Sequence, residues 1–141
     1  MEVTRQLADF IVRTDPAAIS PEAREMGKKA ILDLLGVALA GSRDPLARIL
    51  THFIKDSGGR SRASVWGKKF KTSAAFAALA NGTFGHALDY DDINRSMRGH
   101  PTVPVLPAAL AAAEEVRASG EETLAAFLIG FEVETKIGAG L

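Results

Sequence analysis

The hydrophobic and polar positions of the chain repeat with the period of α-helices along most of its length. Apolar residues recur three and four positions apart, as on the buried stripe of an amphipathic helix. In the first segment, Thr4 is predicted to cap a helix that buries Leu7, Phe10 and Ile11. The run Thr14-Asp15-Pro16 is predicted to end this helix.

Local start and stop signals divide the rest of the chain into further helices. Ser20-Pro21-Glu22 combines a capping hydroxyl, a proline at the first helical position and an acid in the first turn. Asp44-Pro45 repeats this signal, and Ser73 is a third capping residue. The predicted helices run from Ser20 to Gly41, from Asp44 to Asp56, from Ala74 to about Leu88, from Pro104 or Pro107 to about Ala118, and from Glu121 to Leu141.

The segment 63–72 lacks helical periodicity. Ala63 to Trp66, Gly67-Lys68-Lys69 and Phe70 to Thr72 are typical of a short hairpin, which is too short to found a sheet. No repeat, linker or low-complexity tract divides the chain. The sequence therefore predicts one all-α domain over residues 1–141, with about six helices and one short extended or hairpin segment near 63–72.

Composition narrows the classes of function. The 17 basic residues equal the 17 acidic ones, so the chain offers no net positive field for nucleic acid or membrane lipid. It has no cysteine, which excludes disulfides, thiolate metal sites and a cysteine nucleophile. The start lacks a secretory signal, and no apolar run approaches the ~18 residues of a spanning helix. We expect a soluble cytoplasmic protein with no nucleic-acid or membrane partner.

Ionisable residues are concentrated between two apolar segments, in the stretch from Asn81 to Pro107. Such clusters are typical of functional sites. The stretch contains two of the three histidines, three aspartates and two arginines: His86, Asp89, Asp91, Asp92, Arg95, Arg98 and His100.

Each of these residues has a catalytic and a structural interpretation. On a continuing helix, Asp89 lies three residues after His86 on the same face, where it either orients the imidazole for catalysis or forms a structural hydrogen bond. His100 precedes a predicted helix N-terminus, which favours a neutral imidazole that can act as a base. Spacing alone favours a surface histidine. For Asp91 and Asp92, a structural role as the cap of a short helical turn is as well supported as a role in catalysis.

Two further alternatives concern ligands. Arg95 and Arg98 either hold a substrate carboxylate or neutralise the aspartates, and the bare sequence favours neutralisation. Aspartates with flanking histidines also suit a hard divalent cation. The spacing matches neither an EF-hand nor H-E-x-x-H, so the sequence predicts no metal.

Several separated motifs resemble the MmgE/PrpD family. They are N-G-T-F-G-H-A-L-D-Y-D-D from Asn81, G-H-P-T-V-P-V-L-P from Gly99, I-L-D-L-L-G-V-A-L-A-G from Ile31, and A-S-V-W-G from Ala63. The resemblance covers nearly all of the chain. The family includes 2-methylcitrate dehydratase, cis-aconitate decarboxylase and iminodisuccinate epimerase.

The resemblance implies a helical domain, completed in full-length members by a smaller α/β domain. It implies a cytosolic or mitochondrial homodimeric enzyme of small di- or tricarboxylates that needs no cofactor. Asp89 and His100 match active-site positions of the family and are the predicted catalytic residues. Arg98 and Thr102 are weaker candidates for binding the substrate carboxylate, Thr102 because it is expected at a helix N-terminus. Further catalytic histidine, lysine and tyrosine residues are expected beyond Leu141.

Two hypotheses of function follow. In the first, the chain is the amino-terminal helical part of a MmgE/PrpD-type lyase or epimerase that transfers a proton beside a carboxylate. In the second, it is a truncated, non-catalytic helical module that acts in oligomerisation. The last residues, Ile137 to Leu141, are apolar and lack a helix cap, so we expect that this chain matches only part of a full-length member.

Overall fold

A computed structural model describes residues 2–140 and confirms the predicted all-α fold. Its helices are joined by short connections, except for residues 58–73, which contain the two short strands, and the loop of residues 87–101. The elements are α1 (Glu2–Arg13), the 3-10 turn η1 (Pro16–Ala18), α2 (Pro21–Gly41), α3 (Pro45–Ser57), β1 (Ala63–Ser64), β2 (Lys71–Thr72), α4 (Ala74–His86), α5 (Thr102–Val116) and α6 (Gly120–Ala139).

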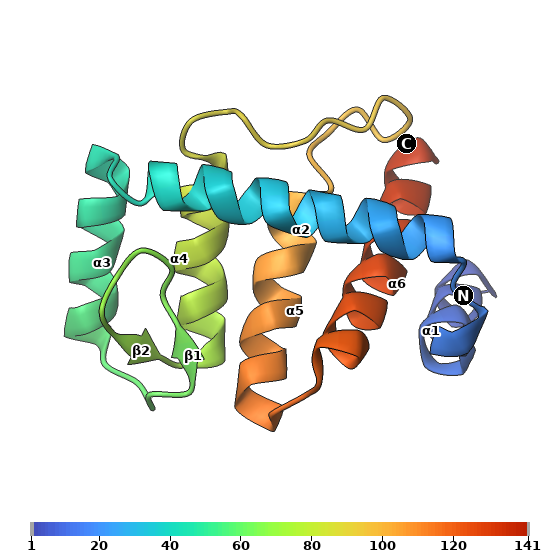
Figure 1. Ribbon diagram of the computed structural model, residues 1–141, viewed down its shortest axis with the longest axis horizontal. Helices are drawn as coiled ribbons and strands as arrows, with labels where there is room; N and C mark the ends of the chain where they lie inside the picture. Colours follow the sequence, from blue (N-terminus) through green and yellow to red (C-terminus); the bar gives the residue numbers. More distant parts are fainter. Residues whose placement is uncertain (1, 141) are drawn as a thin grey trace.

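Most of the helices form a row, and α2 crosses this row (Figure 1). In the row, α3 packs against α4, α4 against α5, α5 against α6, and α6 against α1. The long helix α2 contacts α4, α5 and α6. The loop that joins α4 to α5 runs along one edge of the domain, past one end of these helices (Figure 1). The candidate chemistry of the sequence lies in this loop.

Three helix starts follow the predicted capping residues. Ser20 accepts a hydrogen bond from Ala23 N at the start of α2, Asp44 accepts one from Leu46 N at the start of α3, and Ser73 accepts one from Phe76 N at the start of α4. Ser119 and Glu122 form a complete capping box at the start of α6, where the sequence predicted only a break between helices. The predicted hairpin is also confirmed, because β1 and β2 pair antiparallel with Ala63 opposite Thr72.

Two apolar clusters fill the space under α2. One lies towards α3 and α4 and contains the buried residues Ala38, Ala47, Ile54, Val65, Ala80 and Phe84. The other lies towards α5 and α6 and contains Leu34, Leu106, Leu124 and Phe127. Because both clusters include residues of α2, this helix holds the two halves of the row together.

The predicted buried face of the first helix is wrong. Within Glu2–Arg13 no residue is buried: Phe10 is 37% exposed and Ile11 is 48% exposed. Thr4 lies inside the helix rather than at its cap. The physical reason is that α1 packs at the end of the row, where its main contact is with α6, so its apolar stripe is little covered.

Apolar side chains are also exposed elsewhere on the surface. On α2 and α3 they include Leu32, Leu39, Ile49 and Phe53, each more than half exposed. No helix within residues 2–140 combines the length and the apolar character that a membrane crossing requires.

Candidate active site

The loop between α4 and α5 turns sharply as soon as it leaves α4. That helix ends at His86, and Asp89 has a left-handed backbone with φ of 54°. The predicted pairing of Asp89 with His86 on one continuous helical face is therefore wrong. The turn instead brings the following aspartate, Asp91, back onto His86.

Asp91 lies between two imidazoles. Its side chain is 0% exposed, and both of its oxygens lie 3.0 Å from Nδ1 of His86. Nδ1 of His100 lies 3.3 Å from Oδ2 of Asp91. That second contact lacks the angles of a hydrogen bond, so it is a close polar approach rather than a formed bond. The buried carboxylate thus has a histidine on two sides, which offsets the cost of removing its charge from water.

The predicted pair of Asp89 and His100 is brought together on the outer side of the site. Nε2 of His100 lies 3.7 Å from Oδ1 of Asp89, whose side chain is 79% exposed. The rings of His86 and His100 meet edge to face, with centroids 4.9 Å apart. Both histidines line an open cavity of about 540 Å³ between α4 and the start of α5, together with Thr83 and Val103. A small ligand in this cavity would reach both imidazoles.

Asp92 determines where α5 begins. Its Oδ2 accepts a 2.6 Å hydrogen bond from Thr102 Oγ1, and its Oδ1 accepts one of 3.2 Å from Thr102 N. An acid at a helix N-terminus is favourable because it meets free N–H groups and the positive end of the dipole. Helix α5 therefore starts at Thr102, earlier than the predicted Pro104 or Pro107.

Thr102 does lie at a helix N-terminus, as predicted. It is 1% exposed, however, and Asp92 accepts from both its hydroxyl and its N–H. The anion position of this N-terminus is thus filled by the chain's own carboxylate. The role of Thr102 in substrate binding stays a prediction.

The two arginines lie on the outer part of the loop. Asn94 and Gly99 pair as an isolated antiparallel bridge, and Arg98 turns the chain between them with φ of 55°. Arg95 and Arg98 are both exposed, and neither forms an ion pair with another residue of the described range 2–140. No ion pair between these arginines and the aspartates therefore supports the favoured interpretation that the arginines neutralise them. The role of Arg98 in substrate binding stays a prediction.

A further carboxyl group lies close to Asp92. Burial, and then the neighbouring charge of Asp92, raise the pKa of Glu134 on α6 above its ordinary value of 4.5. One of its carboxylate oxygens is buried without a hydrogen-bond partner in the part of the chain that the structure describes. Sequence reasoning did not identify Glu134, because nothing in the spacing along α6 links it to the loop.

The cluster also has the composition of a metal site. His86, Asp89, Asp91 and His100 each offer one ligand atom, and these atoms lie within 4.8 Å of one another. Imidazole and carboxylate together suit several divalent cations. The same atoms suit proton transfer, so the geometry alone leaves both chemistries available.

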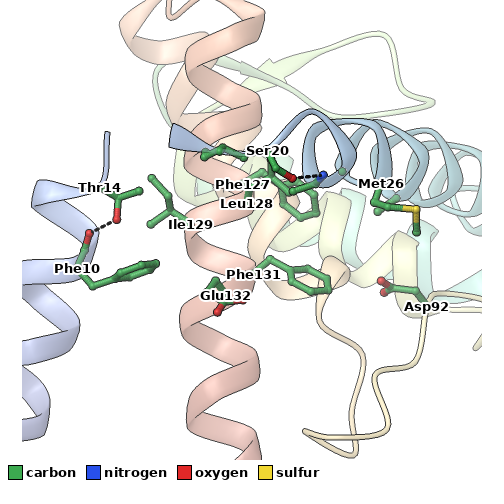
Figure 2. A pocket seen from close by; sticks show the side chains of 14 residues that line it. Phe10, Thr14, Ser20, Met26, Asp92, Phe127, Leu128, Ile129, Phe131 and Glu132 are labelled. Carbon is green, nitrogen blue, oxygen red and sulfur yellow. Dashed lines mark hydrogen bonds between the residues drawn. The ribbon is translucent and has the colours of Figure 1, made fainter. Parts of the chain in front are cut away.

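A second cavity, of about 530 Å³, lies between α1, α2 and α6 (Figure 2). Figure 2 shows Phe10 of α1 and Phe131 of α6 among the side chains that line it, with Asp92 at one side. Its lining is mainly apolar, and it contains no histidine. Proton transfer on a polar substrate therefore fits the cavity at His86 and His100 better.

Comparisons with known proteins identify the family. The MmgE/PrpD N-terminal domain matches residues 5–141, which is almost the whole chain. The chain belongs to the MmgE/PrpD family. The resemblance seen in the sequence motifs is thereby confirmed.

Several relatives within the family are named for one activity. A cis-aconitate decarboxylase-like protein, oryM, of Aspergillus oryzae is 28% identical over 99% of this chain and 30% of its own length. The cis-aconitate decarboxylase of Mus musculus is 32% identical over 78% of this chain and 23% of its own. That of Homo sapiens is 28% identical over 96% of this chain and 29% of its own. The chain thus spans less than a third of the length of these relatives.

Proposed function

We propose that this chain is the amino-terminal helical part of a MmgE/PrpD-type enzyme that acts on small di- or tricarboxylates. The observation that carries the proposal is the position of His100. Its imidazole borders an open cavity, with the exposed carboxylate of Asp89 at Nε2 and the buried carboxylate of Asp91 at Nδ1. The names of the relatives suggest cis-aconitate as the first substrate to test.

The proposed chemistry is proton transfer at a carbon beside a carboxylate. His100 serves as the acid or base, and Asp89 orients it or positions the substrate. Arg98 is the candidate for binding a substrate carboxylate, since it is exposed on the same loop, and Thr102 is the weaker one. Loss of water, loss of CO₂ or reprotonation on the other face then gives dehydration, decarboxylation or epimerisation. The family resemblance implies further catalytic histidine, lysine and tyrosine groups, and we propose that a longer protein supplies them.

The test is turnover by the natural-length protein, with cis-aconitate, 2-methylcitrate and iminodisuccinate as substrates. His100→Ala is expected to lower the rate by about 100-fold or more, because a general acid or base contributes about 10²–10⁴. His52→Ala is the matched control, since the side chain of His52 on α3 is 82% exposed and pairs with Asp56 on the same helix, away from the site. Unchanged turnover in His100→Ala would contradict the assignment of His100 as the catalytic acid or base.

A chelator separates the metal alternative from acid–base catalysis. Residual turnover in excess EDTA is expected to equal that of the untreated protein, because imidazole and carboxylate need no metal to move a proton. Activity that is lost in EDTA and restored by a divalent cation would instead favour a metal held by His86, Asp89, Asp91 and His100.

We further propose that the natural-length protein is a cytoplasmic homodimer. The apolar side chains that are exposed on α2 and α3 support a protein interface, since exposed apolar surface is often covered by a partner. Light scattering after size exclusion measures the assembly. A monomer at micromolar concentration would contradict the dimer.

The same exposed residues favour a second candidate, a non-catalytic module that acts in oligomerisation. Size exclusion of the 141-residue chain separates the two. A monodisperse oligomer of defined stoichiometry favours the module, whereas aggregation, or binding to the rest of a longer protein, favours the enzyme.

A further inference from the structure

The two histidines and the buried carboxylate of Asp91 form a unit that the pairing of Asp89 with His100 does not explain. Both oxygens of Asp91 lie 3.0 Å from Nδ1 of His86, and Oδ2 lies 3.3 Å from Nδ1 of His100. One carboxylate therefore faces the same ring nitrogen of two different imidazoles. Both histidines also line one open cavity.

An ionised carboxylate accepts hydrogen bonds and donates none, so a neutral imidazole facing it must present its N–H. The contact with His86 therefore requires the tautomer that carries hydrogen on Nδ1. Nδ1 of His100 is buried without a hydrogen-bond partner within residues 2–140, and Oδ2 of Asp91 lies 3.3 Å from it. The contact fails in angle rather than in distance, so a reorientation of the ring would complete that bond.

Asp89 offers the competing acceptor, on the opposite side of the ring of His100. It lies 3.7 Å from Nε2, beyond hydrogen-bond distance, and its side chain is 79% exposed. Water weakens the hold of such a group, whereas the side chain of Asp91 is wholly buried and fixed by His86. The buried carboxylate should therefore decide the tautomer.

We infer that Asp91 is a positioning residue that holds both His86 and His100 in the tautomer protonated at Nδ1. Each imidazole then presents an unprotonated Nε2, the basic atom, to the same cavity. In this arrangement His86 is a second proton acceptor beside His100, close enough for the two to act on one small molecule. The catalytic consequence rests on the proposed function, but the tautomers do not.

Nitrogen-15 NMR of the histidine rings tests the inference directly. The protonated and the bare nitrogen of a neutral imidazole have well-separated resonances, and the chain has only three histidines to assign. Spectra are recorded in EDTA at about pH 8.5, above the ordinary imidazole pKa of about 6.5. The inference predicts hydrogen on Nδ1 in both His86 and His100. Hydrogen on Nε2 of either ring would overturn it.

Two matched variants identify the responsible carboxylate. Asp91→Asn keeps the size of the side chain but removes its charge and replaces one acceptor oxygen with an NH₂ donor. The NH₂ group then faces at least one of the two rings, and that ring should lose its Nδ1–H preference. Asp89→Asn should leave the preference of His100 unchanged. The role of Asp91 would be refuted if a folded Asp91→Asn protein kept the Nδ1–H preference of both rings. It would also be refuted if Asp89→Asn, rather than Asp91→Asn, changed the tautomer of His100. Asp56→Asn, beside His52, is the control for remote effects.

Turnover and folding are kept separate in this test. Circular dichroism checks that each variant is folded, and if Asp91→Asn unfolds, the wild-type tautomers still decide the question. In the natural-length enzyme, Asp91→Asn is expected to lower kcat on the order of 100-fold with little change in KM. An inactive wild-type protein with both rings protonated at Nδ1 would refute the proposed function but not the positioning by Asp91.

Discussion

The packing of α2 against α4 holds the end of α4, where His86 lies, in place. This helix contact depends on Gly41. Gly41 is buried at the end of α2. A Cβ at this position would overlap the backbone oxygen of Phe84 and would lie 3.1 Å from its carbonyl carbon and 3.3 Å from Cβ of Ala87. A backbone oxygen cannot rotate away as a side chain can, so the two helices would have to separate near His86.

The size of the effect follows from two opposed terms. Overpacking a close contact costs about 1–3 kcal/mol, and sometimes more. Replacing glycine by alanine in a helix stabilises the folded state by at most about 1 kcal/mol, and by less at a helix end. Because the overlap is with a backbone oxygen, the overpacking cost lies at or above the upper end of its range, and we expect that Gly41→Ala lowers the free energy of unfolding by about 1–3 kcal/mol after the gain is subtracted. Gly36 of the same helix provides the control, because a Cβ there meets nothing within 4 Å. Gly36→Ala should raise stability by up to about 1 kcal/mol.

Urea unfolding measures the difference between these variants. Circular dichroism follows the helices, and the fluorescence of the single tryptophan, Trp66, follows the packing beside α4. Domains of this size usually unfold in one step, so the two signals should coincide. At roughly 4 °C per kcal/mol, the melting temperature of Gly41→Ala should fall by roughly 4–12 °C. If Gly41→Ala is as stable as Gly36→Ala, the close approach of α2 to α4 is wrong.

Three further predictions concern polar groups near the site and the hairpin. Thr102→Val removes the 2.6 Å bond to Asp92 and should cost about 1.5–3 kcal/mol in urea unfolding; a change below about 0.5 kcal/mol would contradict this bond. Burial raises the pKa of Glu114, but hydrogen bonds from Lys71 and Ser64 outweigh it and lower that pKa below 4.5. Glu114→Gln should therefore cost about 1–3 kcal/mol at about pH 7, and the loss should vanish as the pH falls through the lowered pKa. Burial and Asp92 raise the pKa of Glu134, so its contribution to stability is present below about pH 4.5 and is lost as the pH rises through the folded-state pKa. Glu134→Gln should raise the unfolding free energy at about pH 7 and not at about pH 4, and the opposite order would be inconsistent with a buried carboxyl.

Three helix starts could be predicted because their signals are local. Ser20, Asp44 and Ser73 each accept a hydrogen bond from an N–H two or three residues ahead, so the information lies within one helical turn. The start of α5 could not be predicted in this way. Its cap is the side chain of Asp92, ten residues earlier in the chain, and no local pattern identifies such a partner.

Burial was less predictable than helicity. A periodic apolar stripe shows that a helix has an apolar face, but the neighbours decide whether this face is covered. The stripe on α2 lies over the row and buries Leu34 and Ala38. The stripe on α1 lies at the end of the row, where Phe10 and Ile11 remain exposed.

The candidate site was predictable as a cluster and not as a set of contacts. Sequence reasoning identified the stretch and its two histidines, and the structure brings Asp89, Asp91 and both histidines together. It did not identify Asp91 as their shared partner. The sharp turn after His86, with the left-handed Asp89, reverses which aspartate faces the ring. Such a turn depends on the backbone, which spacing along a helix does not reveal.

Deuterium exchange is the most direct test of the claim that this loop moves a proton beside a carboxylate. The natural-length protein is incubated in D₂O with cis-aconitate and other small di- and tricarboxylates, and proton NMR follows the hydrogens beside the carboxylates. This step is common to dehydration, decarboxylation and epimerisation, so it needs no prior choice among them. The account predicts exchange in at least one acid and a loss of about 100-fold or more in His100→Ala. Exchange that persists in His100→Ala, or its absence from every acid in the wild-type protein, would contradict the account.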